Sequence, residues 1–291
     1  MTKTIGVIGL GSIGLRHTKN LKAMGHQVIG YDPIQNIAFA PIVPCLDDVI
    51  TVSDVLVIAS PTQDHYAHLL AARDKPCLVE KPIAETMDQL VGLVGRPYPV
   101  MVGYNLRFHG CVKKAKEWLD AGRIGDPLWA NFTLGQRSIK PPYLRDGVIL
   151  NFASHEIDMA LYLLGPAKVL CATTKTTNSD EMMTDFVLEH DSGCRSSNHT
   201  DYITFPEQRY FTITGTKGRI FINVAEFLGS LMVNGEFVDE VHAPKDWNQT
   251  YIDEIEAFLA RVEGKETFGC SGQEGLKVLK ICLEVKKLSG L

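Results

Sequence analysis

The sequence lacks any uninterrupted apolar run near the roughly 20 residues that a membrane-spanning helix needs, and its N-terminus lacks the apolar core of a secretory signal peptide. Positive charge is not in excess either, because 29 Lys and Arg residues against 34 Asp and Glu residues give a formal net charge of −5. Such a chain has no basic field for nucleic acid or an anionic membrane. We therefore expect a soluble cytoplasmic protein that binds neither nucleic acid nor a membrane.

Paired cysteines are also missing. The seven cysteines are scattered, odd in number and never arranged as Cys-x-x-Cys, which predicts reduced thiols rather than a disulfide framework or a zinc site. His65 and His68 stand three residues apart, but no third ligand lies near them in the sequence. We expect no bound metal.

The chain does contain a glycine loop between a strand and a helix. The apolar run Thr4–Ile8 is typical of a strand buried on both faces of a parallel sheet. The loop Gly9-Leu10-Gly11-Ser12-Ile13-Gly14 follows, and then a segment with helical apolar spacing that ends at Gly25. The first glycine permits a tight turn, the second lets the backbone approach a pyrophosphate, and the third allows close helix packing. This pattern predicts a dinucleotide site with its phosphates at the helix N-terminus.

An acidic residue follows the next predicted strand. Gln27–Tyr31 ends at Asp32, close to the roughly 20-residue interval at which an acid bonds the adenosine ribose. A carboxylate there would repel a 2′-phosphate, and the residues just after it include no arginine. We expect NAD to be preferred over NADP; the alternative is that Asp32 only caps a strand.

Strands and helices continue to alternate, which predicts a doubly wound parallel sheet, the Rossmann arrangement, over residues 1–120. Further strands are predicted at Val55–Ala59, Cys77–Val79 and Val100–Tyr104. Right-handed crossovers would bring the residues that follow the strands to one edge of the sheet. Those residues are Gly9, Asp32, Pro61, Lys81 and Asn105.

The pattern changes after Pro127, where residues 128–134 alternate between apolar and polar positions as a half-buried strand does. We expect residues 121–291 to form an α+β domain on an open, mainly antiparallel sheet. One helix is predicted at about Leu150–Leu164, and two more end the chain. Further strands are predicted at Val169–Thr176, Phe186–His190, Tyr210–Thr214, Arg219–Val224 and Leu228–Val233.

Motifs over nearly the whole chain resemble those of the Gfo/Idh/MocA family of sugar and polyol oxidoreductases. In order, the matching residues are Gly9 to Gly14 with His17, Ser60-Pro61-Thr62 with His65, Glu80-Lys81-Pro82, Gly103-Tyr104-Asn105 with Arg107-Phe108, and Ser154-His155 with Asp158. The resemblance implies a Rossmann domain and an α+β domain whose open sheet mediates homodimers or homotetramers. It also implies NAD(H)-dependent hydride transfer to or from a hydroxyl or carbonyl carbon of a sugar, inositol or sugar derivative, acidic or nucleotide-linked ones included.

The resemblance assigns the chemistry to Lys81, His155 and Asn151. Oxidising a secondary alcohol calls for a base to take the hydroxyl proton and a cation near the developing oxyanion. Lys81 would supply the cation, with Glu80 holding its turn, and His155 would carry the proton because imidazole titrates near neutral pH. Asp158, three residues on, either orients the His155 ring or is a solvated helix residue.

Two sets of contacts follow from the resemblance. The cofactor set is Gly9, Gly11, Ser12, Ile13, Gly14, Asp32, Ser60, Pro61, Thr62, His65, Glu80 and Lys81. The substrate set is Asn105, Arg107, Tyr143, Arg145, Asn151 and His155. For two of these residues there are alternatives: Arg107 paired with a helix carboxylate, and Tyr143 as a packed loop anchor.

The sequence departs from the family pattern at Asn151, where many members carry an aspartate four residues before the histidine. An asparagine can bond a substrate hydroxyl or orient an imidazole, but it cannot stabilise an imidazolium by charge. A second hypothesis is therefore a non-catalytic sensor that binds NAD and a sugar. A third, a 2-hydroxy-acid dehydrogenase, explains the glycine loop but not the order of the later motifs.

Overall fold

The computed structural model describes residues 2–34, 40–93, 99–137, 146–177 and 180–291. The chain forms two compact units, Met1–Tyr104 with Tyr251–Lys277, and Asn105–Thr250 with Val278–Leu291. The predicted division after residue 120 differs from this one in two ways. The first unit ends before Asn105, and it takes in a second segment from near the C-terminus.

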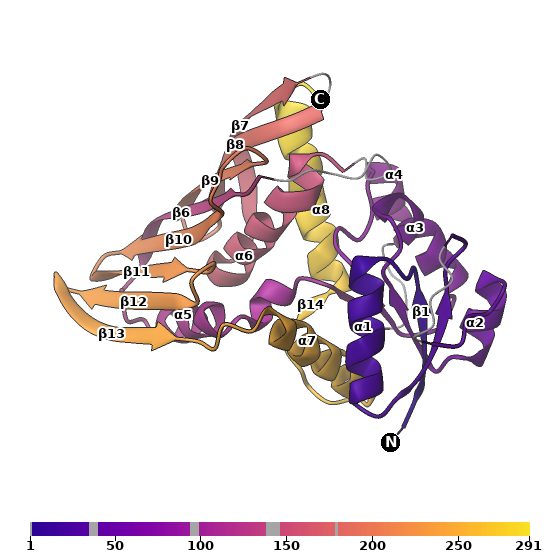
Figure 1. The fold of residues 1–291 in the computed structure, drawn as a ribbon. Helices are drawn as coiled ribbons and strands as arrows, with labels where there is room; N and C mark the ends of the chain where they lie inside the picture. The colour runs from indigo at the N-terminus through magenta and orange to yellow at the C-terminus, as the bar shows by residue number, and fades with distance from the viewer. Residues whose placement is uncertain (1, 35–39, 94–98, 138–145, 178–179) are drawn as a thin grey trace. The chain divides into compact units, whose positions relative to one another are not determined.

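A six-stranded sheet organises the first unit (Figure 1). Strands β1 to β5 run parallel, and β14 pairs antiparallel with β5. The order across the sheet is β14-β5-β4-β3-β1-β2. The strands are β1 (Thr4–Ile8), β2 (Gln27–Tyr31), β3 (Val55–Ile58), β4 (Cys77–Val79), β5 (Val100–Val102) and β14 (Cys270–Ser271).

The central strands of this sheet are buried on both faces, which is why they appear in the sequence as continuous apolar runs. Every residue of β3 and of β4 is buried. Gly25, with φ +84°, ends the first helix as its position predicted. The predicted parallel Rossmann-type sheet is confirmed. Its connecting helices are α1 (Ser12–Ala23), α2 (Leu46–Val52), α3 (Thr62–Ala71) and α4 (Met87–Leu93).

The winding of the sheet reverses at β1, because β2 lies on one side of β1 and β3 on the other. At such a switch point the loops after two neighbouring strands diverge and open a crevice at the carboxyl edge of the sheet. Here the two loops are those after β1 and β3, which lie close together where they leave the sheet: a Cβ built on Gly9 would lie 2.5 Å from the backbone nitrogen of Ser60. The glycine loop therefore stands where ligands bind in sheets of this type.

An eight-stranded sheet organises the second unit, in the order β13-β12-β11-β10-β6-β9-β8-β7. Its ladders are antiparallel except for the parallel pair of β6 and β9. The predicted open, mainly antiparallel sheet is confirmed. The strands are β6 (Pro127–Gly135), β7 (Ala167–Thr177), β8 (Asp180–His190), β9 (Arg195–Asp201), β10 (Gln208–Gly215), β11 (Gly218–Asn223), β12 (Leu228–Val233) and β13 (Glu236–His242).

Helices α5 (Gly110–Asp120) and α6 (Ser154–Leu164) pack on one face of this sheet, α5 against β11 to β13 and α6 against β6 and β9 (Figure 1). Ala130, Phe132 and Leu134 of β6 are buried, as predicted. Leu128 was expected to join them but is 55% exposed, because it stands where the register of β6 with β10 shifts. Strands β9 and β13 were not predicted.

The helix predicted from Leu150 does not begin there as an α-helix. Residues Ile149–Ala153 form a π-helical turn, η2, and the α-helix starts at Ser154. Such wide turns are frequent at functional sites, and this one carries Asn151. A 3-10 turn, η1 (Asn105–Phe108), precedes α5. The two closing helices are present as α7 (Trp247–Val262) and α8 (Gly272–Leu288).

None of the helices within the described ranges has the length and apolar character of a membrane span.

Candidate active site

The glycine loop after β1 adopts the geometry that its sequence predicts. Gly9 has φ +87°, and its N–H donates to the carbonyl oxygen of Tyr31 at 2.8 Å. A Cβ on Gly14 would fall on the Gly9 carbonyl oxygen, so only glycine lets α1 start this close to the strand. A Cβ on Gly11 would meet nothing within 4 Å. The three glycines thus differ: two are required by packing, and the third borders open space.

Asp32 is joined to the same loop. Its Oδ2 accepts a hydrogen bond from the backbone N–H of Leu10 at 2.7 Å, and its Oδ1 accepts one from the N–H of Ile34 at 2.8 Å. The carboxylate is therefore fixed at the end of β2, beside the backbone of the glycine loop. It does more than cap the strand, because it holds the two loops of the predicted nucleotide site together.

The loop after β3 begins α3 and is tied down by two histidines. Ser60 Oγ bonds His68 Nδ1 at 2.9 Å, and Pro61 stands at the helix N-cap with Thr62 as the first helical residue. His65 is buried, and its ring nitrogens lie 2.8 Å from the carbonyl oxygens of Ser60 and Pro82. Both nitrogens of His65 are thus used inside the protein.

Glu80 and Lys81 follow β4 at the same edge, and the Lys81–Pro82 peptide bond is cis. Glu80 Oε1 lies 2.8 Å from Nε2 of His17 on α1. Burial by itself would raise the pKa of Glu80, but the hydrogen bond with His17 and the charges of His17, Lys81 and His65 lower it overall. Glu80 is therefore held by His17 beside Lys81 with a lowered pKa, and its role as the anchor of the Lys81 turn stays a prediction.

In the second unit, Asn151 lies in the π-helical turn and is half-buried. Its Nδ2 donates to the hydroxyl oxygen of Tyr202 at 3.0 Å, and that hydroxyl donates to the carbonyl oxygen of Gly147 at 3.2 Å. Burial raises the pKa of Tyr202, so the phenol keeps its proton. His155 stands half-buried in the first turn of α6, one turn after Asn151.

Arg107 and Asp158 form a buried ion pair. Arg107 Nη2 lies 2.7 Å from Asp158 Oδ1, and Arg107 Nε donates to both carboxylate oxygens. The Arg107 guanidinium also lies over the Tyr162 ring, 5.1 Å from its centre. The sequence left open the alternative that Arg107 pairs with a helix carboxylate, and the structure shows this pair. Asp158 is 1% exposed, so its interpretation as a solvated residue was wrong.

Of the remaining predicted substrate residues, Asn105 is described by the structure and two others are not. Asn105 is buried, and its Nδ2 donates to Thr250 Oγ1 at 2.8 Å. Tyr143 and Arg145 lie outside the described residues. Of the six predicted substrate residues, the structure therefore places four in the second unit, and it ties Asn105, Arg107 and Asn151 to partners of their own.

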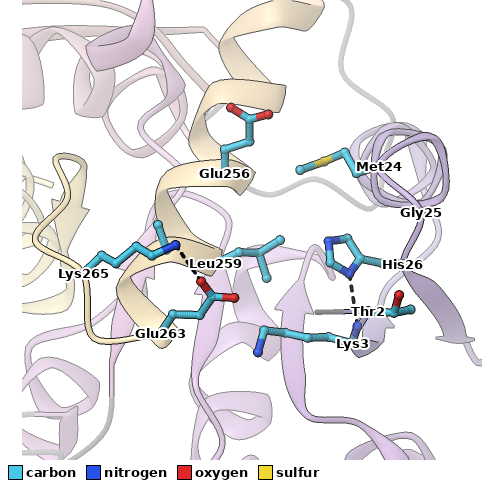
Figure 2. A pocket seen from close by; sticks show the side chains of 10 residues that line it. Thr2, Lys3, Met24, Gly25, His26, Glu256, Leu259, Glu263 and Lys265 are labelled. Carbon is cyan, nitrogen blue, oxygen red and sulfur yellow. Dashed lines mark hydrogen bonds and ion pairs between the residues drawn. The ribbon is translucent and has the colours of Figure 1, made fainter.

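A cavity of about 510 Å³ lies elsewhere in the first unit, lined by Lys3, His26, Glu256 and Glu263 among others (Figure 2). Lys3 precedes β1 and His26 precedes β2, so the cavity borders the amino edge of the sheet. Parallel sheets carry their ligands at the carboxyl edge. This cavity contributes nothing to the predicted site.

Two family models match the chain. The GFO/IDH/MocA C-terminal domain matches residues 112–221, and the NAD-binding domain of D-isomer-specific 2-hydroxyacid dehydrogenases matches residues 1–74. An inositol 2-dehydrogenase of Rhizobium meliloti is 26% identical, over 97% of this chain and 95% of that protein. These matches support the assignment of the chain to the Gfo/Idh/MocA family of oxidoreductases.

Other proteins match this chain over part of its length or in fold. A D-apiose dehydrogenase of Rhizobium rhizogenes is 30% identical over 57% of this chain and 54% of that protein, so the match spans about half of its length. An Agrobacterium radiobacter oxidoreductase, solved with NAD+, L-tartaric acid and magnesium, has a TM-score of 0.88 at 21% identity and covers 100% of this chain and 97% of that one. Levoglucosan dehydrogenase with NADH has a TM-score of 0.90 at 20% identity, with the same coverage.

The sequence did not reveal two hydrogen-bond partners of the predicted site residues. Tyr202, which bonds Asn151, follows a polar strand that was not predicted, and Thr250, which bonds Asn105, lies 145 positions away along the chain. Neither residue belongs to a local motif, so no sequence signal marked it. Among the described residues no group of three or more His, Cys, Asp or Glu side chains could hold a metal ion.

Proposed function

We propose that the protein is an NAD(H)-dependent oxidoreductase that moves hydride between nicotinamide and a hydroxyl or carbonyl carbon of a sugar, inositol or sugar derivative. One observation carries the proposal. The glycine loop, Asp32 and the Glu80-Lys81 turn all follow parallel strands and so stand at one edge of the first sheet, around its switch point. A dinucleotide loop and a lysine at the same edge suit redox chemistry on a bound nicotinamide.

The residues present fit a dinucleotide. Gly11 borders open space where a backbone must approach a pyrophosphate, and the N-terminus of α1 offers backbone N–H groups and a positive dipole end to its charge. Gly9, Ser12, Ile13 and Gly14 would line this cradle. When bound, the nicotinamide supplies or accepts the hydride, and Ser60, Pro61 and Thr62 would border it from the next loop.

Lys81 and His155 are the proposed catalytic residues. The Lys81 ammonium would bond the reacting oxygen and stabilise negative charge that builds up on it as the hydride leaves the carbon. The His155 imidazole would take the hydroxyl proton during oxidation and return it during reduction. Asn151 would contact a substrate hydroxyl as a neutral amide, since it carries no charge for a His155 imidazolium.

NAD is the proposed cofactor in preference to NADP. The Asp32 carboxylate, held by the Leu10 and Ile34 N–H groups, would accept bonds from the ribose hydroxyls and repel a 2′-phosphate. Asp32→Asn keeps an acceptor for the Leu10 N–H but removes the charge. The ratio of kcat/KM with NAD+ to that with NADP+ should then fall about tenfold or more, the equivalent of roughly 1.4 kcal/mol; an unchanged ratio would exclude Asp32 as the selector.

The substrate is proposed to be a polyhydroxylated ring or sugar. The relatives with sequence similarity include D-apiose, inositol and xylose dehydrogenases, and Asn151 with His155 supplies neutral hydrogen-bonding groups for hydroxyls. Tyr143 and Arg145 stay in the proposed substrate set, and Arg145 would suit an acidic substituent. Arg107 contributes through its pair with Asp158.

Homodimers or homotetramers are proposed to form through the second sheet. Alternation along β6 and β12 turns Trp129 and Met232 away from the buried face, and they are 45% and 40% exposed. Exposed apolar residues on one sheet face favour self-association. Light scattering of the wild type and of Trp129→Glu tests this, and a monomeric wild type would exclude it.

The function is tested by nicotinamide absorbance with NAD+ or NADH against sugars, inositols, uronic acids and nucleotide sugars, with Lys81→Ala in parallel. Turnover by the wild type that the variant lacks would support the enzyme. Thermal stabilisation by NADH and a sugar, with no nicotinamide conversion in either direction, would overturn it and favour the sensor.

A further inference from the structure

His65 makes two contacts that a neutral imidazole cannot both satisfy. Its Nδ1 lies 2.8 Å from the Pro82 carbonyl oxygen, and its Nε2 lies 2.8 Å from the Ser60 carbonyl oxygen. A carbonyl oxygen only accepts hydrogen bonds, whereas a neutral imidazole has one N–H donor and one acceptor nitrogen. In either neutral tautomer a ring lone pair would therefore face a carbonyl lone pair at hydrogen-bond distance. Only the imidazolium, with two N–H donors, makes both contacts favourable.

The surroundings of His65 can hold such a charge. The side chain is 1% exposed, and a buried cation requires a compensating group. Glu80 provides one, because the charge of His65 is among the influences that lower the Glu80 pKa. Lys81 and His17 share that carboxylate, and Asp64 and His68 lie near on the same helix. Among the described residues, the groups that take part in these interactions are Glu80 and Asp64 on the negative side and Lys81, His17 and His68 on the positive or titratable side.

The two carbonyls belong to two different parts of the proposed site. Ser60 lies in the loop after β3, next to Gly9, and Pro82 follows Lys81 directly. A single side chain therefore links the cofactor side of the switch point to the turn that carries Lys81. Because both ring nitrogens are used in this link, His65 has no ring donor left for a cofactor.

We propose that His65 is a positioning residue, present as an imidazolium, that clamps the Ser60 and Pro82 carbonyls and thereby fixes Lys81 relative to the cofactor loop. This role rests on the proposed function for its effect on turnover, but its protonation state does not. His65 contributes to the cofactor site through these carbonyls rather than by direct contact.

Two other histidines provide matched references. His190 is buried with both nitrogens bonded, to the Gly165 carbonyl oxygen and to Ser196 Oγ, but a hydroxyl can donate, so its neutral form suffices. His199 bonds two carboxylates, those of Asp185 and Asp201, and its pKa is raised. The structure thus contains, for comparison with His65, one histidine whose pKa is lowered and one whose pKa is raised.

The direct test is a long-range proton–nitrogen NMR spectrum of the wild type with ¹⁵N-labelled histidine, at about pH 7.5, one unit above the ordinary histidine pKa. His65, assigned from the spectrum of His65→Gln, should show two protonated ring nitrogens, whereas His190 should show one protonated and one bare nitrogen. A bare nitrogen on His65 would overturn the proposal, whether or not the protein turns over a substrate.

The second test uses His65→Phe, which keeps a ring but has no donor, with His190→Gln as control. His65→Phe should lower kcat by roughly 10- to 100-fold, as misplacement of a catalytic group by about 1 Å does, with KM for NAD+ changed less than about threefold. The control should leave both constants unchanged. An unchanged kcat in folded His65→Phe would contradict the positioning role.

If the wild type converts no nicotinamide with any substrate, the proposed function fails while the clamp remains testable. The ¹³C signal of reductively methylated Lys81, assigned with Lys81→Ala, then replaces kcat. It should move in His65→Phe and stay in place in His190→Gln. A Lys81 signal that does not move in His65→Phe would overturn the clamp.

Discussion

The two units keep their polar groups in different places. In the first sheet the central strands are buried on both faces, so polar side chains stand at the strand ends, as Asp32 and Lys81 do. In the second unit polar groups lie inside: Ser196, Asn198 and Thr200 of β9 are buried under the helices, and so is the Arg107–Asp158 pair. The strands of the first sheet therefore carry no polar side chains of the site, although His17 and His65 on its helices are buried, whereas in the second unit a strand itself carries buried polar side chains. Variants of side chains at the strand ends of the first site, such as Lys81, should lose activity alone, and variants at the second should lose stability as well.

The largest effect is expected from Asp158→Ala. Removing one partner leaves the buried Arg107 charge uncompensated, which should lower the free energy of unfolding by about 3 to 5 kcal/mol. Urea unfolding measures the change. Replacing both partners by apolar residues, Asp158→Leu with Arg107→Met, should recover most of the loss. A fully stable single variant would break the comparison, because the second site would then be independent of its core.

Next comes Lys81→Ala, which tests the opposite half of the comparison. Loss of a cation at the reacting oxygen should lower kcat by roughly 10² to 10³, as removal of one oxyanion-stabilising group does. The half-buried side chain stands at the sheet edge, so the urea midpoint should hardly change. Steady-state kinetics and urea unfolding of the same preparation measure the changes in kcat and in stability. A large loss of stability would show that Lys81 supports the fold.

Gly11→Ala and Gly14→Ala sharpen the comparison within one loop. Gly11 borders open space, so Gly11→Ala should fold normally but weaken NADH binding about tenfold, roughly 1.4 kcal/mol, because the methyl group occupies the pyrophosphate approach. Gly14→Ala should lose stability too, since its methyl group would meet the Gly9 carbonyl. Calorimetric titration and thermal unfolding separate the two. Equal losses of stability would contradict the assignment of Gly11 to the cofactor.

The smallest effect concerns His199 on β9. Burial would lower the pKa of His199, but the bonds with Asp185 and Asp201 raise it overall. A raised folded-state pKa means that the stabilisation is present below the unfolded pKa and is lost as the pH rises through the folded value. His199→Gln should therefore cost about 1 kcal/mol or less near pH 6 and almost nothing near pH 9.

Asp201 determines the lower end of the pH range in which the His199 bonds stabilise the fold. Burial would raise the pKa of Asp201, but the N–H groups of Thr204 and Ile203, the Thr204 hydroxyl and His199 lower it overall. Its contribution is present above the unfolded pKa and is lost as the pH falls through the folded value. Urea unfolding of His199→Gln at several pH values tests both limits, and a loss that grows with rising pH would contradict the sign.

What the sequence could predict follows from how each strand is buried. β3 and β4 are apolar runs, and β12, Leu228–Val233, was predicted with its observed bounds. β9 was missed because its sequence, Arg195–Asp201, contains no apolar residue, although Ser196, Asn198 and Thr200 are buried in it. Its polar side chains form hydrogen bonds with neighbouring strands, as His199 does with Asp185. Such bonds leave no periodic pattern of apolar residues in the sequence.

The candidate site divides in the same way. The local geometry of Gly9, Gly14, Asp32 and Glu80 could be predicted because local motifs determine it, while their roles at the site stay predictions. Arg107 remained ambiguous because its partner Asp158 is 51 positions away, and Tyr202 is equally distant from Asn151. Long-range pairs of this kind are set by packing in the second unit rather than by neighbours in the chain.

The most direct test of the central claim is transfer of label. A substrate found by the nicotinamide screen is deuterated at its carbinol carbon and incubated with NAD+ and the wild type, and the cofactor is analysed by NMR and mass spectrometry. The account predicts NADH that carries one deuterium at C4 of the nicotinamide, and almost none with Lys81→Ala. NADH without deuterium, or binding of the substrate with no reduced cofactor, would contradict hydride transfer by this protein.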